Sequence, residues 1–207
     1  MARRIEQTLA MVMLAAAAGG CASPRSRFYT LDSTATATGA SASYAVAVEE
    51  VSIPASVDRP EFVVQVAANQ VALDEFNRWA APLGDGIARV VAGDLEKLLG
   101  TPKVAVAPLV NFVPAYRVTV DVQRFESTPG TGVLVEAVWI VERRADGGTR
   151  SGRTVARETV QDKSFDALAA AHSRALATVS DDIAGAIRAE ADRGATDAPG
   201  PKRRSPK

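Results

Sequence analysis

The strongest constraint on the fold is a run of three strand patterns joined by short turns. Apolar and polar residues alternate from Tyr116 to Phe125, which is the period of a strand with one buried face. The alternation returns from Val133 to Val141, and Thr149 to Val160 fits a third strand. Turn signals lie at Ser127–Gly132 and Asp146–Gly148. Consecutive strands with connections this short pair antiparallel, so we predict a meander.

Two amphipathic helices flank this meander. The first follows Pro82 and ends at Gly100, and its apolar residues recur every three or four positions. Its predicted buried stripe is Leu83, Ile87, Val90, Val91, Leu95, Leu98 and Leu99. Its predicted solvent face is Asp85, Arg89, Asp94, Glu96 and Lys97. The second helix is capped by Ser164, and its stripe is Phe165, Leu168, His172, Leu176, Val179, Ile183 and Ile187.

Earlier in the chain, Tyr44–Val51 has the alternation of a strand. Phe62–Val66 and Val71–Leu73 alternate on either side of a turn at Ala68–Asn69, which indicates a hairpin. A further short strand is predicted at Lys103–Ala107. Strands, a helix, a meander and a helix together predict an α+β fold. We expect a two-layer sandwich of a mostly antiparallel sheet with two main amphipathic helices.

The N-terminus has the parts of a bacterial lipoprotein signal peptide. Arg3 and Arg4 give a positive start, and Leu9–Ala18 is an apolar run too short to span a bilayer. Small residues then precede Cys21, the only cysteine. This resembles a lipobox, in which the cysteine is acylated and the chain is cut just before it, although Ala18 stands where leucine is usual. The alternative is an ordinary secretory signal with an incidental cysteine.

We therefore divide the chain into four segments. Residues 1–20 are the signal peptide, and residues 21–43 are a lipidated, Ser/Thr/Ala/Gly-rich flexible tether. Residues 44–190 form the folded domain. Residues 191–207 are a disordered basic tail, which either contacts anionic lipid or is simply solvated. Because Ala22 rather than aspartate follows the cysteine, we expect an anchor in the outer membrane of a Gram-negative bacterium, with the domain on the periplasmic face.

The sequence offers little for chemistry. One cysteine and one histidine are too few for the usual metal sites, and no cofactor-binding motif is present, so we expect neither metal nor cofactor. No motif of a catalytic nucleophile appears, and we expect that the protein is not an enzyme. The 24 basic and 24 acidic residues balance, and no basic stripe with interleaved aromatics indicates nucleic-acid binding. His172 lies on an apolar stripe, so we interpret it as packed or facing a second subunit rather than as a ligand.

The most unusual segment runs from Val57 to Leu83. It places arginine, asparagine and tryptophan in proline-flanked loops, and such residues favour a binding anchor. The candidate partner or subunit interface is Asp58, Arg59, Pro60, Asn77, Trp79 and Pro82. The alternative is that Trp79 caps the core and that Arg59 pairs with Asp58 or Glu75.

These residues also carry a resemblance. The lipobox cysteine, Asp58-Arg59-Pro60, Trp79-Ala80-Ala81-Pro82-Leu83, and the strand at Tyr116–Phe125 followed by a strand ending in Trp139 resemble the PqiC family of ABC-type transport auxiliary lipoproteins. The resemblance implies an outer-membrane lipoprotein that docks a periplasmic lipid-transport tunnel. It implies an MCE-domain protein as partner and, through it, an inner-membrane ABC or permease component. It also implies a homo-oligomer.

Two other functions stay open at this point. A structural lipoprotein that scaffolds another envelope machine, for secretion or lipopolysaccharide assembly, would share the anchor and the fold. An enzyme of unknown type would need a catalytic set that the sequence does not display. The transport subunit and the scaffolding lipoprotein differ only in the partner, so the identity of the partner decides between them.

Overall fold

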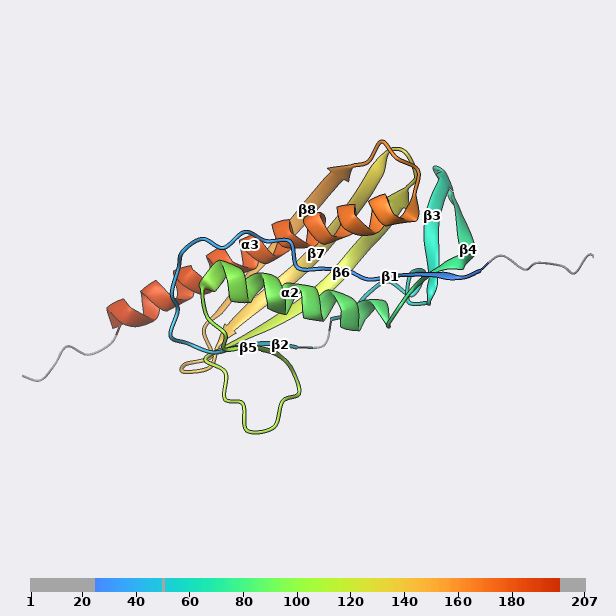
Figure 1. The fold of residues 1–207 in the computed structure, drawn as a ribbon. Helices are drawn as coiled ribbons and strands as arrows, with labels where there is room; N and C mark the ends of the chain where they lie inside the picture. Colours follow the sequence, from blue (N-terminus) through green and yellow to red (C-terminus); the bar gives the residue numbers. More distant parts are fainter. Residues whose placement is uncertain (1–24, 50, 198–207) are drawn as a thin grey trace, which may run out of the picture.

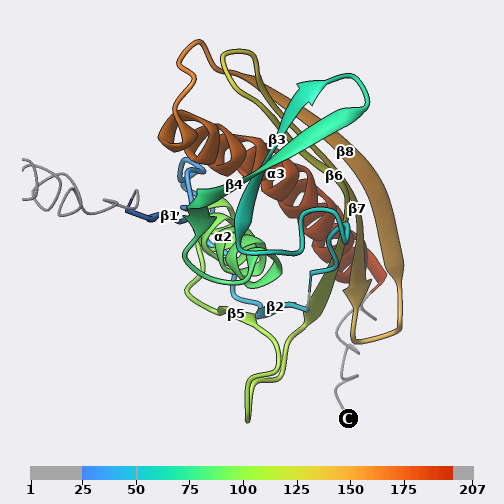
Figure 2. The same ribbon diagram turned by 90° about the vertical axis from the view of Figure 1, so that its right-hand side faces the viewer.

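The computed structural model describes residues 25–49 and 51–197, and it confirms the α+β class. Within these residues the strands form a five-stranded sheet and a separate three-stranded sheet. Figure 1 shows helices α2 (Leu83–Leu99) and α3 (Phe165–Asp197) side by side along the larger sheet. Figure 2 shows both helices on the same side of this curved sheet. The hydrophobic core lies between the helices and the sheet.

The five-stranded sheet has the order β5-β2-β6-β7-β8. Its strands are β5 (Val104–Val106), β2 (Val46–Val48), β6 (Tyr116–Thr128), β7 (Gly132–Arg143) and β8 (Thr149–Thr159). The predicted meander is confirmed, because β6, β7 and β8 pair antiparallel in that order. Strand β2 pairs parallel with both β5 and β6, which completes a mixed sheet.

The three-stranded sheet has the order β1-β4-β3. Its strands are β1 (Arg27–Tyr29), β4 (Gln70–Trp79) and β3 (Glu61–Ala67). The predicted hairpin exists, but β4 continues to Trp79, and its last residues pair parallel with β1. The register shifts between Glu61 and Phe62, and the carboxylate of Asp74 accepts the backbone N–H groups of Phe76 and Asn77. Because of this irregularity and the polar residues of β4, the sequence of this strand shows no simple alternation.

The predicted flexible tether is wrong for residues 30–43. This segment, here called the N-terminal arm, packs along α2 and α3 (Figure 1). Its contacts include Asp32 N to Ser173 Oγ at 3.1 Å, Thr38 Oγ1 to the Leu98 carbonyl at 2.8 Å and Ala42 N to the Leu99 carbonyl at 2.9 Å. The arm is short of apolar residues but rich in small and hydroxyl side chains. Such residues can lie close to two helices and satisfy their polar groups.

Asp94 explains how the arm is held. We predicted this residue on the solvent face of α2, yet it is fully buried. Its carboxylate accepts hydrogen bonds from Ser33 Oγ (2.7 Å), Ala35 N (3.0 Å) and Ser180 Oγ (3.2 Å). A buried carboxylate requires such partners. Asp94 therefore joins the arm, α2 and α3 at one point.

Gly100 closes α2 and leaves room for the arm. Its φ of 63° is left-handed, and its N–H bonds the Glu96 carbonyl, as in a common helix C-cap. A Cβ at this position would collide with the carbonyl oxygen of Ala40. Glycine is thus needed both for the backbone conformation and for the close approach of the arm.

The C-terminal tail was predicted to begin at residue 191, which is too early in the chain. Helix α3 continues through residues 191–197, which we had placed in the disordered tail. The rest of that tail, residues 198–207, lies outside the described residues, as do the predicted signal peptide and Cys21.

Candidate interaction surface

Trp79 is part of the core rather than an exposed anchor. It is the last residue of β4, and only 6% of it is exposed. Its ring stacks on Phe62 with centroids 4.4 Å apart and meets Phe125 edge-on at 6.2 Å. The prediction of a loop tryptophan is therefore wrong, and the alternative that Trp79 caps the core is correct. The polar residues beside Trp79 in the sequence suggested a loop, whereas this part of β4 is a strand with one buried face.

Trp79 belongs to a cluster that joins the two sheets to α3. We call this cluster the aromatic junction; it consists of Tyr29, Phe62, Trp79, Phe125, Phe165 and His172. Three members come from the three-stranded sheet, one from β6 and two from α3. Aromatic pairs in edge-on and offset stacked arrangements add to the stabilisation from burial. The junction thereby fixes the three-stranded sheet against the body of the domain.

His172 is a member of the aromatic junction with a strongly shifted pKa. Complete burial lowers its pKa from 6.5 to about 3, so the ring is neutral near pH 7. It stacks on Phe125 at 3.8 Å, and its Nε2 lies 2.7 Å from Ser127 Oγ. Nδ1 has no partner among the described residues. A serine nucleophile needs a base with a pKa near the working pH and a third group that orients it, and this pair has neither. The prediction of a packed histidine is confirmed.

The Asp58-Arg59-Pro60 turn is exposed and touches the end of β4. Trp79 N donates to the Pro60 carbonyl at 2.8 Å, so the turn and the tryptophan are neighbours as the sequence grouping implied. No ion pair joins Arg59 to Asp58 or Glu75 within the described ranges. Arg59 is exposed, so another molecule can reach its side chain.

The remaining predicted interface residues divide between inside and outside. Asn77 is half-buried, and its Oδ1 accepts the Tyr29 hydroxyl at 2.7 Å, so it supports the aromatic junction. Pro82 is exposed at the start of α2. The exposed part of the candidate interface is thus the Asp58-Arg59-Pro60 turn together with Pro82.

The sequence interpretation missed a group of exposed apolar side chains on the three-stranded sheet. We call this group the apolar end surface; its members are Phe28, Val66, Val71, Leu73 and Phe76. The alternation predicted a hairpin here but does not tell whether the hairpin valines and Leu73 are buried. Figure 1 shows why they are not, because the β3–β4 hairpin stands away from α2 and α3. A small cavity of about 170 Å³ lies between this hairpin and β6.

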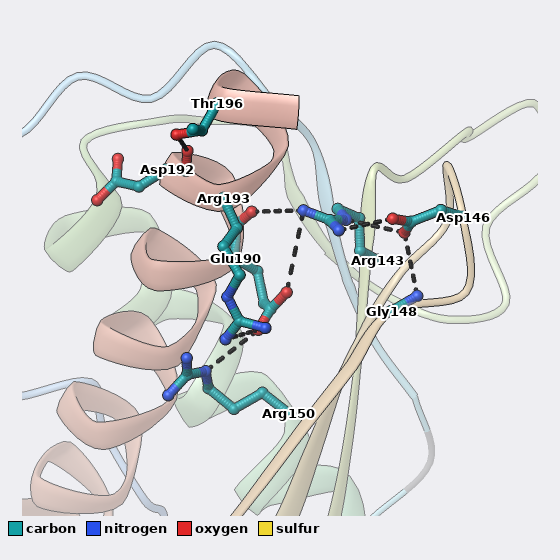
Figure 3. A network of polar contacts seen from close by, with 8 residues as sticks. All are labelled: Arg143, Asp146, Gly148, Arg150, Glu190, Asp192, Arg193 and Thr196. Carbon is teal, nitrogen blue, oxygen red and sulfur yellow. Dashed lines mark hydrogen bonds and ion pairs between the residues drawn. The ribbon is translucent and has the colours of Figure 1, made fainter. Parts of the chain in front are cut away.

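The opposite end of the molecule is built from charges (Figure 3). The side chain of Glu190 on α3 is 1% exposed and pairs with Arg150 at 3.2 Å and with Arg193 at 2.8 Å. Arg143 donates to the Glu190 carbonyl at 2.9 Å and also binds both carboxylate oxygens of Asp146. These hydrogen bonds hold the pKa of Asp146 down at about 2. The network ties the C-terminal half of α3 to the β7–β8 turn.

Within the part of the chain that the structure describes, no group of three or more His, Cys, Asp or Glu side chains could hold a metal ion. No described helix is both long and apolar enough to cross a membrane. What the described surface offers is an exposed arginine turn and an apolar patch at the same end.

These features define an α+β domain of two long helices packed on mixed sheets. The chain belongs to the family of ABC-type transport auxiliary lipoprotein components, whose model matches residues 29–184. The match begins inside β1 and so includes the N-terminal arm. No curated protein matches.

Solved structures agree on the fold. The chain is similar to the crystal structure of protein XCC0632 from Xanthomonas campestris, of family DUF330, with a TM-score of 0.67 and 20% identity over 81% of this chain and 99% of that one. The crystal structure of an uncharacterized protein gives a TM-score of 0.65 and 20% identity over 79% and 99%. A dodecamer of a PelC variant from Paraburkholderia phytofirmans is more distant, with a TM-score of 0.40 and 13% identity over 73% and 92%.

Proposed function

We propose that this protein is a non-enzymatic outer-membrane lipoprotein subunit of an intermembrane lipid transport system. In this proposal an MCE-domain protein is its direct partner, and an inner-membrane ABC or permease component acts through that partner. The observation that carries the proposal is the family match, which covers nearly all of the folded domain and describes an auxiliary lipoprotein of ABC-type transport. The lone Cys21, after a signal-like segment, supports lipid attachment.

The anchor is tested by the mass of the mature N-terminus. Acylation of Cys21 and removal of residues 1–20 would give a protein that begins with a lipidated cysteine. Two or more acyl chains hold a protein on a membrane stably, so Cys21→Ser should release it. Fractionation of the two membranes then tests the outer-membrane location. An unmodified Cys21 in the mature protein would contradict the proposal.

We further propose that the Asp58-Arg59-Pro60 turn and Pro82 contact a protein partner or a second copy of the chain. Arg59 supports this role because it is exposed and forms no ion pair within the described ranges. A rigid, proline-flanked turn loses little entropy on binding, and arginine is enriched among residues that dominate interfaces. Homo-oligomer formation fits the same surface.

Co-purification from native membranes tests the partner. The wild-type protein should bring down an MCE-domain protein, and Arg59→Ala should weaken this association by about 2 kcal/mol if Arg59 is an anchor. Arg157→Ala is the matched control, because Arg157 is an exposed arginine on β8, away from the turn. Both variants should melt like the wild type. Equal capture by both variants would refute the role of Arg59, and capture of a different envelope machine would refute the transport assignment.

A further inference from the structure

The apolar end surface is unusually exposed for large hydrophobic residues. Phe28 is 64% exposed, Val71 58%, Val66 56%, Leu73 47% and Phe76 40%. All five lie on the three-stranded sheet, on neighbouring strands. Five large apolar side chains with this exposure on one three-stranded sheet mark a place where another molecule sits.

The position of the N-terminal arm indicates which molecule lies near the apolar end surface. Because the arm is packed along the helices, the chain leaves the fold at β1 and not at Tyr44. Only five residues separate Cys21 from Arg27, and the six peptide steps between them reach at most about 20 Å. Figure 1 shows that the chain enters the fold at the end formed by β1, β3 and β4, and that the C-terminal end of α3 lies at the other end. A lipid on Cys21 therefore brings the three-stranded sheet close to the bilayer.

We propose that the apolar end surface rests on the lipid surface of the membrane that holds Cys21. This inference depends on the lipid attachment proposed above and adds an orientation to it. The five apolar side chains enter the region between headgroups and acyl chains, where surface-bound proteins bury apolar faces by about 5–10 Å. Arg25 and Arg27, both exposed beside Phe28, lie where they can meet anionic headgroups. The charged end around Glu190 then points away from the bilayer.

A second exposed apolar group serves as an internal control. The loop between β5 and β6 carries Leu109, Val110 and Val113, which are 55%, 87% and 86% exposed. Figures 1 and 2 both place this loop well apart from the β3–β4 hairpin. It has the same apolar chemistry but not the short connection to Cys21. In the proposed orientation it does not touch lipid.

The test measures which group meets the bilayer. Since Cys21 is the only cysteine and is blocked when acylated, Leu73→Cys and Val113→Cys each add one position for a fluorophore in the lipidated full chain. Each labelled protein is placed in vesicles of phosphatidylethanolamine and phosphatidylglycerol that contain a spin-labelled quencher lipid. The label at position 73 should lose about half of its emission or more, because it lies within quenching range of the interface. The label at position 113 should keep its emission.

Each outcome has one meaning. Similar quenching at both positions, stronger quenching at position 113, or no quenching at either would overturn the orientation. The mass of the N-terminus is measured on the same sample. An acylated Cys21 without quenching at position 73 refutes only the orientation, whereas a missing acyl group refutes the anchor and the orientation together. Emission of label 73 that shifts with concentration in lipid-free Cys21→Ser protein would show that a second copy covers the surface, which also overturns the proposal.

Discussion

The two ends of the domain are held together by different forces. At one end the aromatic junction joins two sheets and a helix through apolar contact, and even its histidine is neutral. At the other end Glu190, Arg143 and their neighbours join a helix to a turn through ion pairs and hydrogen bonds. Salt does not screen apolar contact, whereas charge pairs weaken as salt screens them. The contrast shows that one small core can use both forces, each where the surroundings suit it.

Removal of the Trp79 side chain should destabilise the end that holds the aromatic junction, and we expect this effect to be the largest. Trp79→Ala should lower the free energy of unfolding by about 3–5 kcal/mol, because it empties the centre of the aromatic junction. Phe76→Ala on the same strand is the control and should cost far less, since Phe76 is 40% exposed. Chemical denaturation at low and high salt measures both. A loss for Trp79→Ala no larger than for Phe76→Ala would show that the junction does not hold the two sheets together.

Low pH should destabilise the protein through His172. The pKa of His172 is about 3 in the folded protein, below its ordinary value of 6.5. Between these two pH values the unfolded chain binds a proton that the folded protein does not bind. Stability is therefore complete above pH 6.5 and falls as the pH drops toward 3, by about 1 kcal/mol per pH unit. His172→Gln does not titrate and should lack this part of the slope. Unfolding curves of both proteins between pH 7 and pH 4 separate His172 from the carboxylates, and parallel slopes would contradict the burial of a neutral ring.

The charged end should respond more weakly and should depend on salt. Glu190→Gln keeps the shape of the side chain but removes the charge opposite Arg143, Arg150 and Arg193. We expect a loss of about 1–3 kcal/mol, because three partly exposed arginines can return to water. The loss should shrink in high salt, which is the difference from Trp79→Ala. A salt-independent loss would indicate that Glu190 acts through packing.

The smallest effect is expected at Asp146. Arg143 and the Gly148 N–H lower its pKa from 3.8 to about 2, so its contribution is complete above pH 4 and disappears as the pH falls through 2. The carboxylate is exposed, and exposed pairs contribute little. Asp146→Asn should therefore melt close to the wild type at pH 7, and a large drop in melting temperature would show that the turn depends on this one ion pair.

Periodicity predicted the regular parts of this fold well. The meander, both helices and the hairpin follow from alternation and from stripes with helical spacing, because one face of each element is buried. Irregular burial is where prediction failed. Trp79 follows five residues with no simple alternation, and Asp94 is a charge on a buried face. In both cases the cause is a partner segment from far away in the chain, which no local pattern contains.

The candidate surface was predicted only in part. The turn at Arg59 was identified from its composition, and the structure leaves it exposed. The apolar end surface was missed because alternating valines look the same whether their face is covered or open. The N-terminal arm was missed for the opposite reason, since small and hydroxyl residues are typical of linkers. Only the polar groups of α2 and α3, which the arm satisfies, distinguish this segment from a linker.

The arm also sets an order of events during synthesis. Asp32 and Ser173, which it brings together, are 141 residues apart, so the first part of the mature domain to be made waits for the last helix. Contacts between such distant residues form late and slowly. Until α3 is complete, the arm has only the α2 part of the surface that it finally covers. Completion of α3 supplies Ser173 and Ser180, and the arm is then enclosed by both helices.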